Sequence, residues 1–315
     1  MKTSDQHHTD PTARTPHQLA AGPAPEPLDA VAAARTGRIA GKRRRTSAPP
    51  AHSLTRFREG GGDPLLLIHG LGLSWRSWQP VLPALALEHD VLALDLPGFG
   101  TAPPLTDRTP TAEALADAIE DELDRAELGR VHIAGNSIGG WIALELARRG
   151  RAITVVALSP SGLETPAERI AVIGMNELMR ARNVAAAPAA ALLTADLASR
   201  SSMLGGLHGR PWQMPARDAA AEIQDFAGAP GFQSTLRSTT GSRVPAGLSE
   251  IRVPARICFG TRDMMIGALT APRFAAVIPG AQLIPLVGCG HVPMADDPRL
   301  VADAITGLTA ADLVA

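Results

Sequence analysis

The stretch from residue 131 to residue 147, VHIAGNSIGGWIALELA, constrains the fold of this chain more than any other. An apolar run leads into a tight turn with Ser137 at its apex, and strong helix formers follow, so we expect strand, turn and helix. Gly135 and Gly139 flank the serine in the pattern GxSxG. Small residues at these positions let strand and helix pass close to a strained serine, so the pattern predicts a nucleophile elbow.

Strands and helices are predicted to alternate on both sides of this stretch. Continuous apolar runs predict buried strands at residues 65–68, 91–94 and 153–158, and strands return at 253–259 and 281–286. A half-exposed strand is expected from Ser53, and helices are expected at 75–87, at 111–128 and from Pro298. The alternation predicts an α/β fold with a mostly parallel central sheet and helices on both faces.

The alternation breaks between residues 161 and 247, where we expect a helical cap inserted over the sheet. Helix-like pieces at 167–182, 185–199 and 216–226 are separated there by loops with Gly and Pro. The α/β core is then expected at 49–160 and 248–315. Residues 1–48 are rich in Pro, Ala, Thr, His and Arg and are predicted to form a disordered tail. The basic run at 42–45 lacks the apolar segment that a signal peptide needs.

Composition narrows the class of protein. The 315 residues are 45% hydrophobic with a net charge of −1, which indicates a sizeable core and no general attraction to nucleic acid or membranes. No run of about 18 apolar residues is present, so no membrane span is expected. Cys258 and Cys289 form no disulfide framework, which favours a reducing, cytoplasmic location. Without phosphate-loop, dinucleotide or metal-ligand motifs, no cofactor and no metal are expected.

A serine hydroxyl becomes a nucleophile only when a base takes its proton, and that base needs an orienting carboxylate. The segment GTRD places Asp263 directly after the predicted strand RICF. The segment GCGH places His291 after AQLIPLV. Both side chains therefore follow later strands, where the carboxyl ends of parallel strands would gather them near Ser137.

Five segments, in order, carry a resemblance to a known family: IHGLGLSW, DLPGFG, GNSIGGW, FGTRD and GCGHVPMADDP. Together they resemble the signature segments of the α/β-hydrolases, most of all the capped esterase, lipase and cofactor-free haloperoxidase-like branch, over residues 54–308. The resemblance implies Ser137 as nucleophile, Asp263 as orienting acid and His291 as general base. It also implies an oxyanion hole made by the backbone N–H groups of Leu71 and Ile138.

Other side chains near these segments compete for the same roles. Asp296 and Asp297 are rivals of Asp263, which we favour because it follows a strand directly; the pair is predicted to cap the last helix at Pro298. In the family that the chain resembles, the residue equivalent to His69 is structural and braces the oxyanion loop. Asp95 is expected to tie down the DLPGFG turn.

The predicted function is a serine hydrolase that cleaves an ester, thioester or lactone of a small to medium hydrophobic substrate through an acyl-enzyme. Serine at position 137 argues against haloalkane dehalogenase and epoxide hydrolase chemistry, which use a carboxylate nucleophile in this fold. Two alternatives stay open. One is a perhydrolase, haloperoxidase-like enzyme or C–C bond hydrolase, and the other is a ligand receptor or regulatory protein built on the same fold.

Methionines are candidates for the substrate pocket. Met264 and Met265 follow the predicted acid, and Met175 and Met179 belong to the predicted cap. Flexible thioether side chains would make an adaptable apolar site for a hydrophobic acyl compound. The competing interpretation is that the cap methionines only fill gaps in a core. The sequence does not indicate an oligomeric state.

Overall fold

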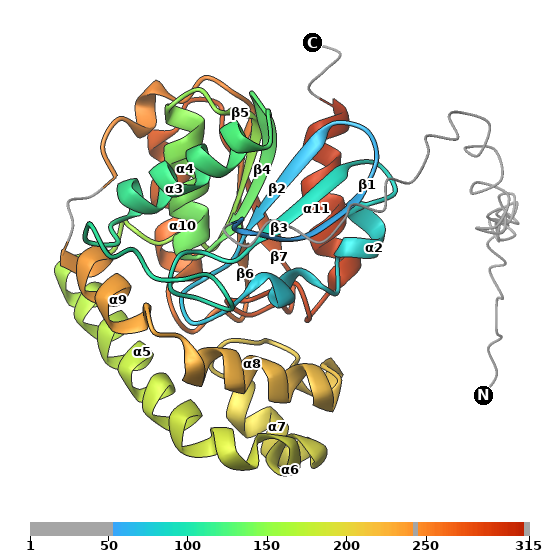
Figure 1. Cartoon of the computed structure of the whole chain (residues 1–315), viewed down its shortest axis with the longest axis vertical. Coiled ribbons are helices and arrows are strands. Elements are labelled where there is room, and N and C mark those ends of the chain that lie inside the picture. The colour runs from blue at the N-terminus through green and yellow to red at the C-terminus, as the bar shows by residue number, and fades with distance from the viewer. Residues whose placement is uncertain (1–52, 242–244, 312–315) are drawn as a thin grey trace, which may run out of the picture. The chain divides into compact units, whose positions relative to one another are not determined.

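A seven-stranded sheet lies at the centre of the fold (Figure 1). The structure is a computed structural model that describes residues 53–241 and 245–311, so the predicted tail, residues 1–48, lies outside the described residues. The strand order is β1-β3-β2-β4-β5-β6-β7; β1 runs antiparallel to β3, and every other neighbouring pair is parallel. The strands are β1 (Thr55–Gly60), β2 (Pro64–Ile68), β3 (Asp90–Leu94), β4 (Val131–Asn136), β5 (Ala152–Leu158), β6 (Ala255–Gly260) and β7 (Gln282–Leu286). The predicted α/β fold with a mostly parallel sheet is confirmed.

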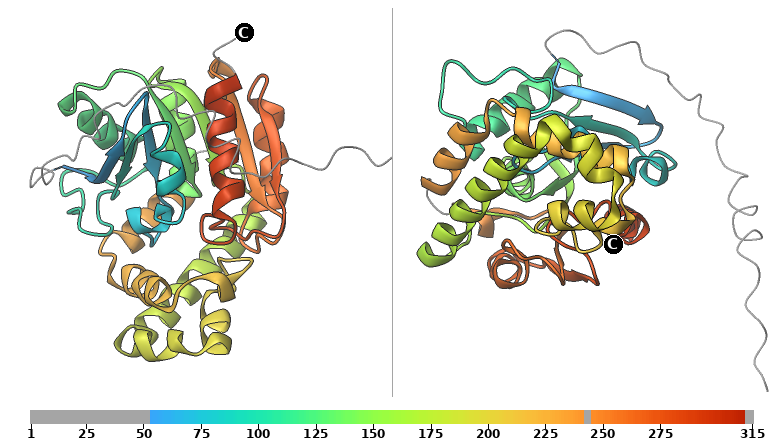
Figure 2. Two further views of the ribbon diagram at one scale, coloured as in Figure 1. Left: turned by 90° about the vertical axis from the view of Figure 1, so that its right-hand side faces the viewer. Right: turned by 90° about the horizontal axis from the view of Figure 1, so that it is seen from below.

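Helices cover both faces of this sheet (Figure 2). The central strands β2, β3, β4 and β5 are buried almost throughout because their apolar side chains meet helices on either side. One face carries α3, α4 and α10, and the other carries α2 and α11. These helices are α2 (Leu82–Leu85), α3 (Ala112–Arg125), α4 (Ile138–Arg148), α10 (Gly267–Val277) and α11 (Pro298–Ala311). Among the described residues, no helix is both long enough and apolar enough to cross a bilayer.

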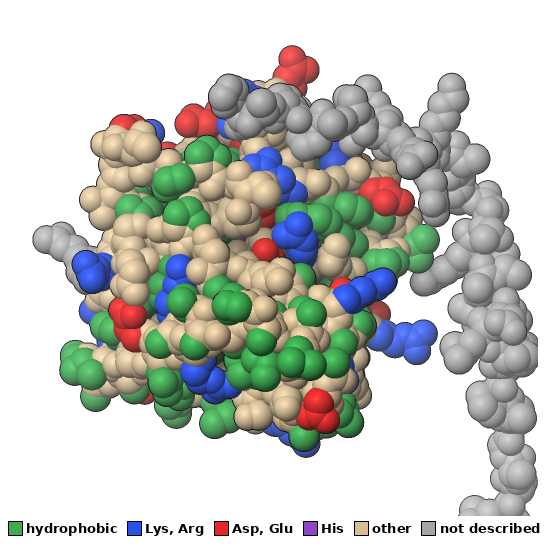
Figure 3. All heavy atoms as spheres, turned by 60° about the horizontal axis from the view of Figure 1, so that its bottom comes forward, with side chains coloured by type: hydrophobic (Ala, Val, Ile, Leu, Met, Phe, Trp, Pro, Cys, Tyr) green, Lys and Arg blue, Asp and Glu red, His purple; other side chains and the backbone are tan. Residues whose placement is uncertain are grey.

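Between β5 and β6 the described residues are mainly helical, and we refer to residues 161–247 as the insertion (Figure 1). Its helices are α5 (Pro166–Ala186), α6 (Ala190–Ala195), α7 (Leu197–Leu204), α8 (Ala216–Gly228) and α9 (Phe232–Gly241). Thr165 starts α5 with a capping box that Glu168 completes. A small apolar cluster that includes Leu204 and Ile223 holds α6, α7 and α8 together. Figure 3, which brings the insertion side forward, shows apolar side chains scattered among charged ones.

Two stretches of the chain depart from the predicted helices. The single helix expected at 75–87 is wrong: a 3₁₀ turn (Trp75–Trp78) and the short α2 replace it. Pro80 lies between them, and a proline inside a helix removes an N–H donor and clashes with the preceding turn. Helices α9 and α10 are not anticipated, because α9 is rich in Ser and Thr and α10 contains Pro272.

Candidate active site

Ser137 occupies the sharp turn between β4 and α4. Its backbone lies at φ 58° and ψ −119°, a region that residues other than glycine rarely adopt. A Cβ on Gly135 would lie 2.1 Å from the carbonyl oxygen of Gly139, and a Cβ on Gly139 would lie 2.3 Å from that of Ile68. Only glycine at both positions lets strand and helix meet this closely, which explains why the serine sits within GxSxG.

His291 and Asp263 meet through a hydrogen bond at the ends of the last two strands. Nδ1 of His291 lies 2.9 Å from Oδ2 of Asp263, and both side chains are buried. The other carboxylate oxygen accepts the backbone N–H groups of Met265 (2.8 Å) and Ile266 (3.1 Å). This network fixes the carboxylate and orients the imidazole ring from its Nδ1 side, which leaves Nε2 available for chemistry.

The pKa of Asp263 lies well below its usual range. Burial by itself would raise this pKa, but the charge and hydrogen bond of His291, together with the Ser159 hydroxyl and the Met265 N–H, outweigh it. The carboxyl group is therefore ionised at neutral pH. An ionised carboxylate keeps the proton of a neutral His291 on Nδ1, and it stabilises the ring when the ring becomes protonated.

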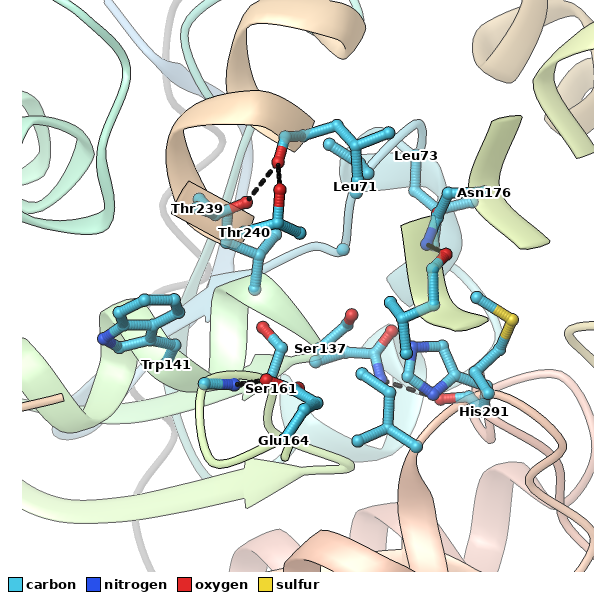
Figure 4. A pocket seen from close by; sticks show the side chains of 18 of the residues that line it. Leu71, Leu73, Ser137, Trp141, Ser161, Glu164, Asn176, Thr239, Thr240 and His291 are labelled. Atoms are coloured by element: carbon cyan, nitrogen blue, oxygen red, sulfur yellow. Dashed lines mark hydrogen bonds between the residues drawn. The ribbon is translucent and has the colours of Figure 1, made fainter. Parts of the chain in front are cut away.

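One cavity brings Ser137 and His291 together (Figure 4). It is narrow, about 50 Å³, and lies between the sheet and the insertion. Within the described part of the chain, no hydrogen bond joins the Ser137 hydroxyl to the His291 ring; such bonds commonly tighten only when substrate binds. Apolar walls come from Leu71, Leu73, Ile138, Trp141, Val172, Leu207, Phe226, Leu236, Met265, Ile266 and Val292, and polar ones from Asn136, Ser161, Glu164, Arg169, Asn176, Thr239 and Thr240.

Leu71 and Ile138, the two predicted N–H donors, both line this cavity. Ile138 is the first residue of α4, so its N–H has no acceptor within the helix, and the Ser137 side chain does not cap it. Leu71 lies in the loop after β2, and this loop approaches the serine closely. A Cβ on Gly70 would lie 3.3 Å from Cβ of Ser137, so glycine keeps that approach open. Among the described residues, neither of these N–H groups donates to a protein acceptor, and two such donors beside a serine suit an oxygen that becomes negatively charged.

His69 braces the loop that carries Leu71 and does not line the cavity. Its ring is fully buried; Nδ1 bonds the carbonyl of Gly70 at 2.8 Å, and Nε2 accepts the N–H of Leu96 at 2.9 Å. Burial lowers the pKa of His69, which agrees with a neutral ring that donates on one side and accepts on the other. Asp95 holds the turn DLPGFG, because its Oδ2 accepts the N–H of Thr101 at 2.9 Å. Its Oδ1 accepts the N–H of Trp75 at 3.0 Å, which joins this turn to the 3₁₀ turn.

Asp296 and Asp297 have different roles, contrary to the expectation that both cap the last helix. Asp297 does cap α11, because its Oδ1 accepts the N–H of Leu300 at 3.1 Å. Asp296 is buried and accepts three N–H groups, those of Gly209 (2.8 Å), Arg210 (2.7 Å) and Gly290 (2.7 Å). It therefore joins the insertion to the loop that carries His291.

Two further contacts hold the His291 loop, and sequence reasoning did not find them. Nδ2 of Asn136 donates to the carbonyl oxygens of His291 (2.8 Å) and Leu158 (3.2 Å). The N–H of Val292 donates to the carbonyl of Leu207 in the insertion at 3.0 Å. The sequence signal for Asn136 is its position directly before the serine in GNSIGG.

Of the four methionines predicted for the substrate pocket, one lines this cavity. Met265 lines the cavity, but Met264 does not, and its side chain is 69% exposed. Met175 and Met179 pack against the main core and are not part of the cavity wall, as the competing interpretation expected. The sequence shows which side chains are apolar, but not which face of α5 points to the cavity.

Neither cysteine belongs to this site. Cys258 and Cys289 are free and buried, and burial raises the pKa of each thiol to about 12. A thiol with so high a pKa is not a nucleophile at neutral pH. In the part of the chain that the structure describes, no group of three or more His, Cys, Asp or Glu side chains is arranged to hold a metal ion.

The chain belongs to the alpha/beta hydrolase family, because the sequence profile of that family matches residues 65–304. An uncharacterised protein of Mycobacterium tuberculosis is 29% identical over 286 residues, which cover 83% of this chain and 82% of that protein. An epoxide hydrolase of the same organism is 32% identical over 208 residues (62% of this chain and 94% of that protein). A pimeloyl-[acyl-carrier protein] methyl ester esterase of Aromatoleum aromaticum is 28% identical over 256 residues (77% and 98%).

Solved structures show the same fold. The enol-lactonase of Burkholderia xenovorans superposes with a TM-score of 0.65 at 19% identity, over 79% of this chain and 92% of that one. A bacterial membrane phospholipase A superposes with a TM-score of 0.66 at 22% identity, over 81% and 82%. The fold and family together define a hydrolase.

Proposed function

We propose that this hydrolase cleaves carboxylic esters, or the related thioesters and lactones, through an acyl-enzyme on Ser137. The observation that carries the proposal is the arrangement of three side chains. Ser137 stands on a strained turn, in the same cavity as His291, and Nδ1 of that histidine is bonded to the buried carboxylate of Asp263. This is the arrangement that makes a serine hydroxyl nucleophilic.

In this mechanism His291 takes the proton of the Ser137 hydroxyl while the oxygen attacks the substrate carbonyl carbon. The resulting oxyanion accepts hydrogen bonds from the N–H groups of Leu71 and Ile138, each worth roughly 3 kcal/mol to the transition state. His291 then gives the proton to the leaving alcohol or thiol, and the acyl group remains on Ser137. Water, activated by the same histidine, attacks the acyl-enzyme and releases the acid.

A small-molecule substrate with a hydrophobic acyl group suits the narrow cavity. Apolar side chains from the core and the insertion form most of its wall beside Ser137. Two relatives reported above, a methyl ester esterase and an enol-lactonase, have names that specify an ester and a lactone. The epoxide hydrolase relative does not favour epoxide chemistry here, because the residue on the elbow is a serine and not a carboxylate.

A fluorophosphonate probe tests the proposal directly. The wild-type chain should be labelled at the peptide that contains Ser137 and should hydrolyse nitrophenyl esters, whereas Ser137→Ala should lose both properties. Ser249→Ala, at an exposed serine outside the cavity, is the matched control and should keep both. A folded wild-type protein that stays unlabelled and inert across an acyl-chain panel would refute the mechanism. Turnover of a β-diketone above that of any ester would instead indicate C–C bond hydrolysis.

A further inference from the structure

A second cavity, of about 600 Å³, lies beside the first and is much larger. One wall comes from the 3₁₀ turn and α2 of the core, and the opposite wall comes from the insertion, mainly α8. The third side is the segment that follows His291, with Val292, Ala295 and Pro298. Nothing in the mechanism above uses this space.

The two cavities adjoin on the His291 side of the serine. Leu73 and Val292 line both cavities, and Val292 is the residue directly after His291. Figure 4 shows Leu73 and His291 on one side of Ser137, and Trp141 and Ser161 on the other. The first cavity therefore reaches to both sides of Ser137, and the second adjoins it only on the histidine side.

The position of the base decides which part of an ester occupies each side. In acyl transfer the histidine returns its proton to the leaving oxygen or sulfur, so the leaving group must lie beside His291. The acyl group then lies on the opposite side, towards Trp141. Resting on the proposed function, we infer that the second cavity is a subsite for a leaving group that extends past Leu73 and Val292.

The wall of the second cavity indicates an uncharged polar leaving group. Its charged side chains are paired with one another: Arg76 with Asp225 at 3.3 Å, Arg217 with Asp218 at 3.2 Å, and His208 with Glu222 at 2.9 Å. An ionic ligand would have to compete with these pairs for its counter-charge. The wall also offers the amide groups of Gln79 and Gln213, whereas the hydroxyls of Ser74 and Ser77 already donate to Asp225 and to the carbonyl of Ser74. Such a surface fits a polyol or another alcohol that exchanges several hydrogen bonds.

Three esters of one acid separate the leaving-group effect from the acyl effect: methyl butyrate, 1-butyrylglycerol and butyrylcholine. The wild type should show a kcat/KM for 1-butyrylglycerol that is about tenfold above that for methyl butyrate. The cationic choline ester should show no such gain. A preference for methyl butyrate, or for butyrylcholine over the glycerol ester, would overturn the assignment.

Variants that fill the second cavity test whether the preference for the glycerol ester arises there. Ala221→Trp on α8 and Gln79→Trp on the opposite wall should each bring the glycerol-to-methyl ratio close to one. Gln224→Trp, exposed on the same helix and outside the cavity wall, should keep the wild-type ratio. An unchanged ratio in both filling variants, with folding confirmed by circular dichroism, would overturn the subsite.

A binding measurement distinguishes failure of the subsite from failure of the proposed function. Calorimetry with Ser137→Ala should detect 1-butyrylglycerol, and adding Ala221→Trp should weaken that binding by about tenfold. This result would support the subsite even if the wild type hydrolysed none of the three esters. Equal affinity with and without Ala221→Trp would reject the subsite, whatever the hydrolytic activity.

Discussion

The side-chain amide of Asn136 donates a 2.8 Å hydrogen bond to the backbone carbonyl of His291. The residue before the serine on β4 thus holds the loop that carries the histidine, across 155 positions of sequence. Its second N–H bonds the carbonyl of Leu158 at the end of β5, so both amide hydrogens are used and the orientation of the amide is determined.

Replacing Asn136 should therefore slow catalysis while leaving the side chains of Ser137, His291 and Asp263 in place. Asn136→Leu removes both donors at similar volume, and we expect kcat to fall about a hundredfold because the histidine loses its alignment. Asn183→Leu is the matched control, since that buried amide bonds only a carbonyl of its own helix. Steady-state kinetics with nitrophenyl butyrate measures the effect. Equal kcat values for the two variants would contradict the positioning role.

Asp263→Asn should keep the shape of the site but remove its charge. The histidine would then lose the partner that holds its proton on Nδ1, and kcat should fall about 10⁴-fold. Asp297→Asn tests the rival acid and should change kcat little, because that side chain caps α11. The opposite ranking of the two variants would reassign the orienting carboxylate.

Gly139→Ala should destabilise the whole fold. The added methyl group would lie 2.3 Å from the carbonyl oxygen of Ile68, which belongs to the central strand β2, so we expect a loss of roughly 2–4 kcal/mol in the free energy of unfolding. Gly174→Ala meets no atom within 4 Å on α5, and should be neutral or stabilising by up to about 1 kcal/mol. Urea unfolding measures both, and similar midpoints would contradict the close packing described.

Asp296→Asn should weaken both stability and catalysis. The carboxylate accepts three backbone N–H groups, and an amide in its place would turn donors towards some of them, so we expect a loss of about 3 kcal/mol. Because one of those N–H groups belongs to Gly290, kcat should fall as well. Asp107→Asn, at an exposed aspartate, should leave both quantities unchanged. A variant with wild-type kcat would show that this junction does not position the histidine.

Glu122 should make the fold sensitive to acid. Hydrogen bonds from Ser53 and Thr55 outweigh burial, which alone would raise its pKa, and the pKa of this carboxyl falls to about 2. A folded-state pKa below the unfolded one means that the stabilisation is complete above about pH 5 and is lost as the pH falls towards 2. Glu122→Gln should flatten this dependence by roughly 1–3 kcal/mol, measured by thermal unfolding between pH 7 and pH 3. A parallel decline in both proteins would contradict this assignment.

The elements that carry chemistry were predictable because their signals are local. A continuous apolar strand followed by a glycine-bracketed serine has few alternatives, and the fold around it is confirmed. Asp263 and His291 were expected to meet because both follow parallel strands, and the structure brings them to 2.9 Å. Their catalytic roles stay predictions that the experiments above test.

What the sequence did not show depends on contacts between distant segments. Nothing in the sequence around Asp296 indicates that two of its three partners, Gly209 and Arg210, lie almost ninety residues earlier. The orientation of Met264 and Met175 follows from tertiary packing, which neither residue type nor spacing reveals. Prolines account for two differences from the predicted helices. A helix was predicted across Pro80 and is interrupted there, whereas none was predicted across Pro272 and α10 accommodates it.

The contact between residues 207–210 and the His291 loop limits how this enzyme can be remodelled. A Cβ on Gly290 would lie 2.5 Å from the carbonyl oxygen of Leu207, so the two backbones touch with no side chain between them. An insertion grafted from another family member would need to reproduce that backbone course, or it would displace the histidine. Changes in specificity are therefore easier to engineer on α8 and α9 than by exchanging the whole insertion.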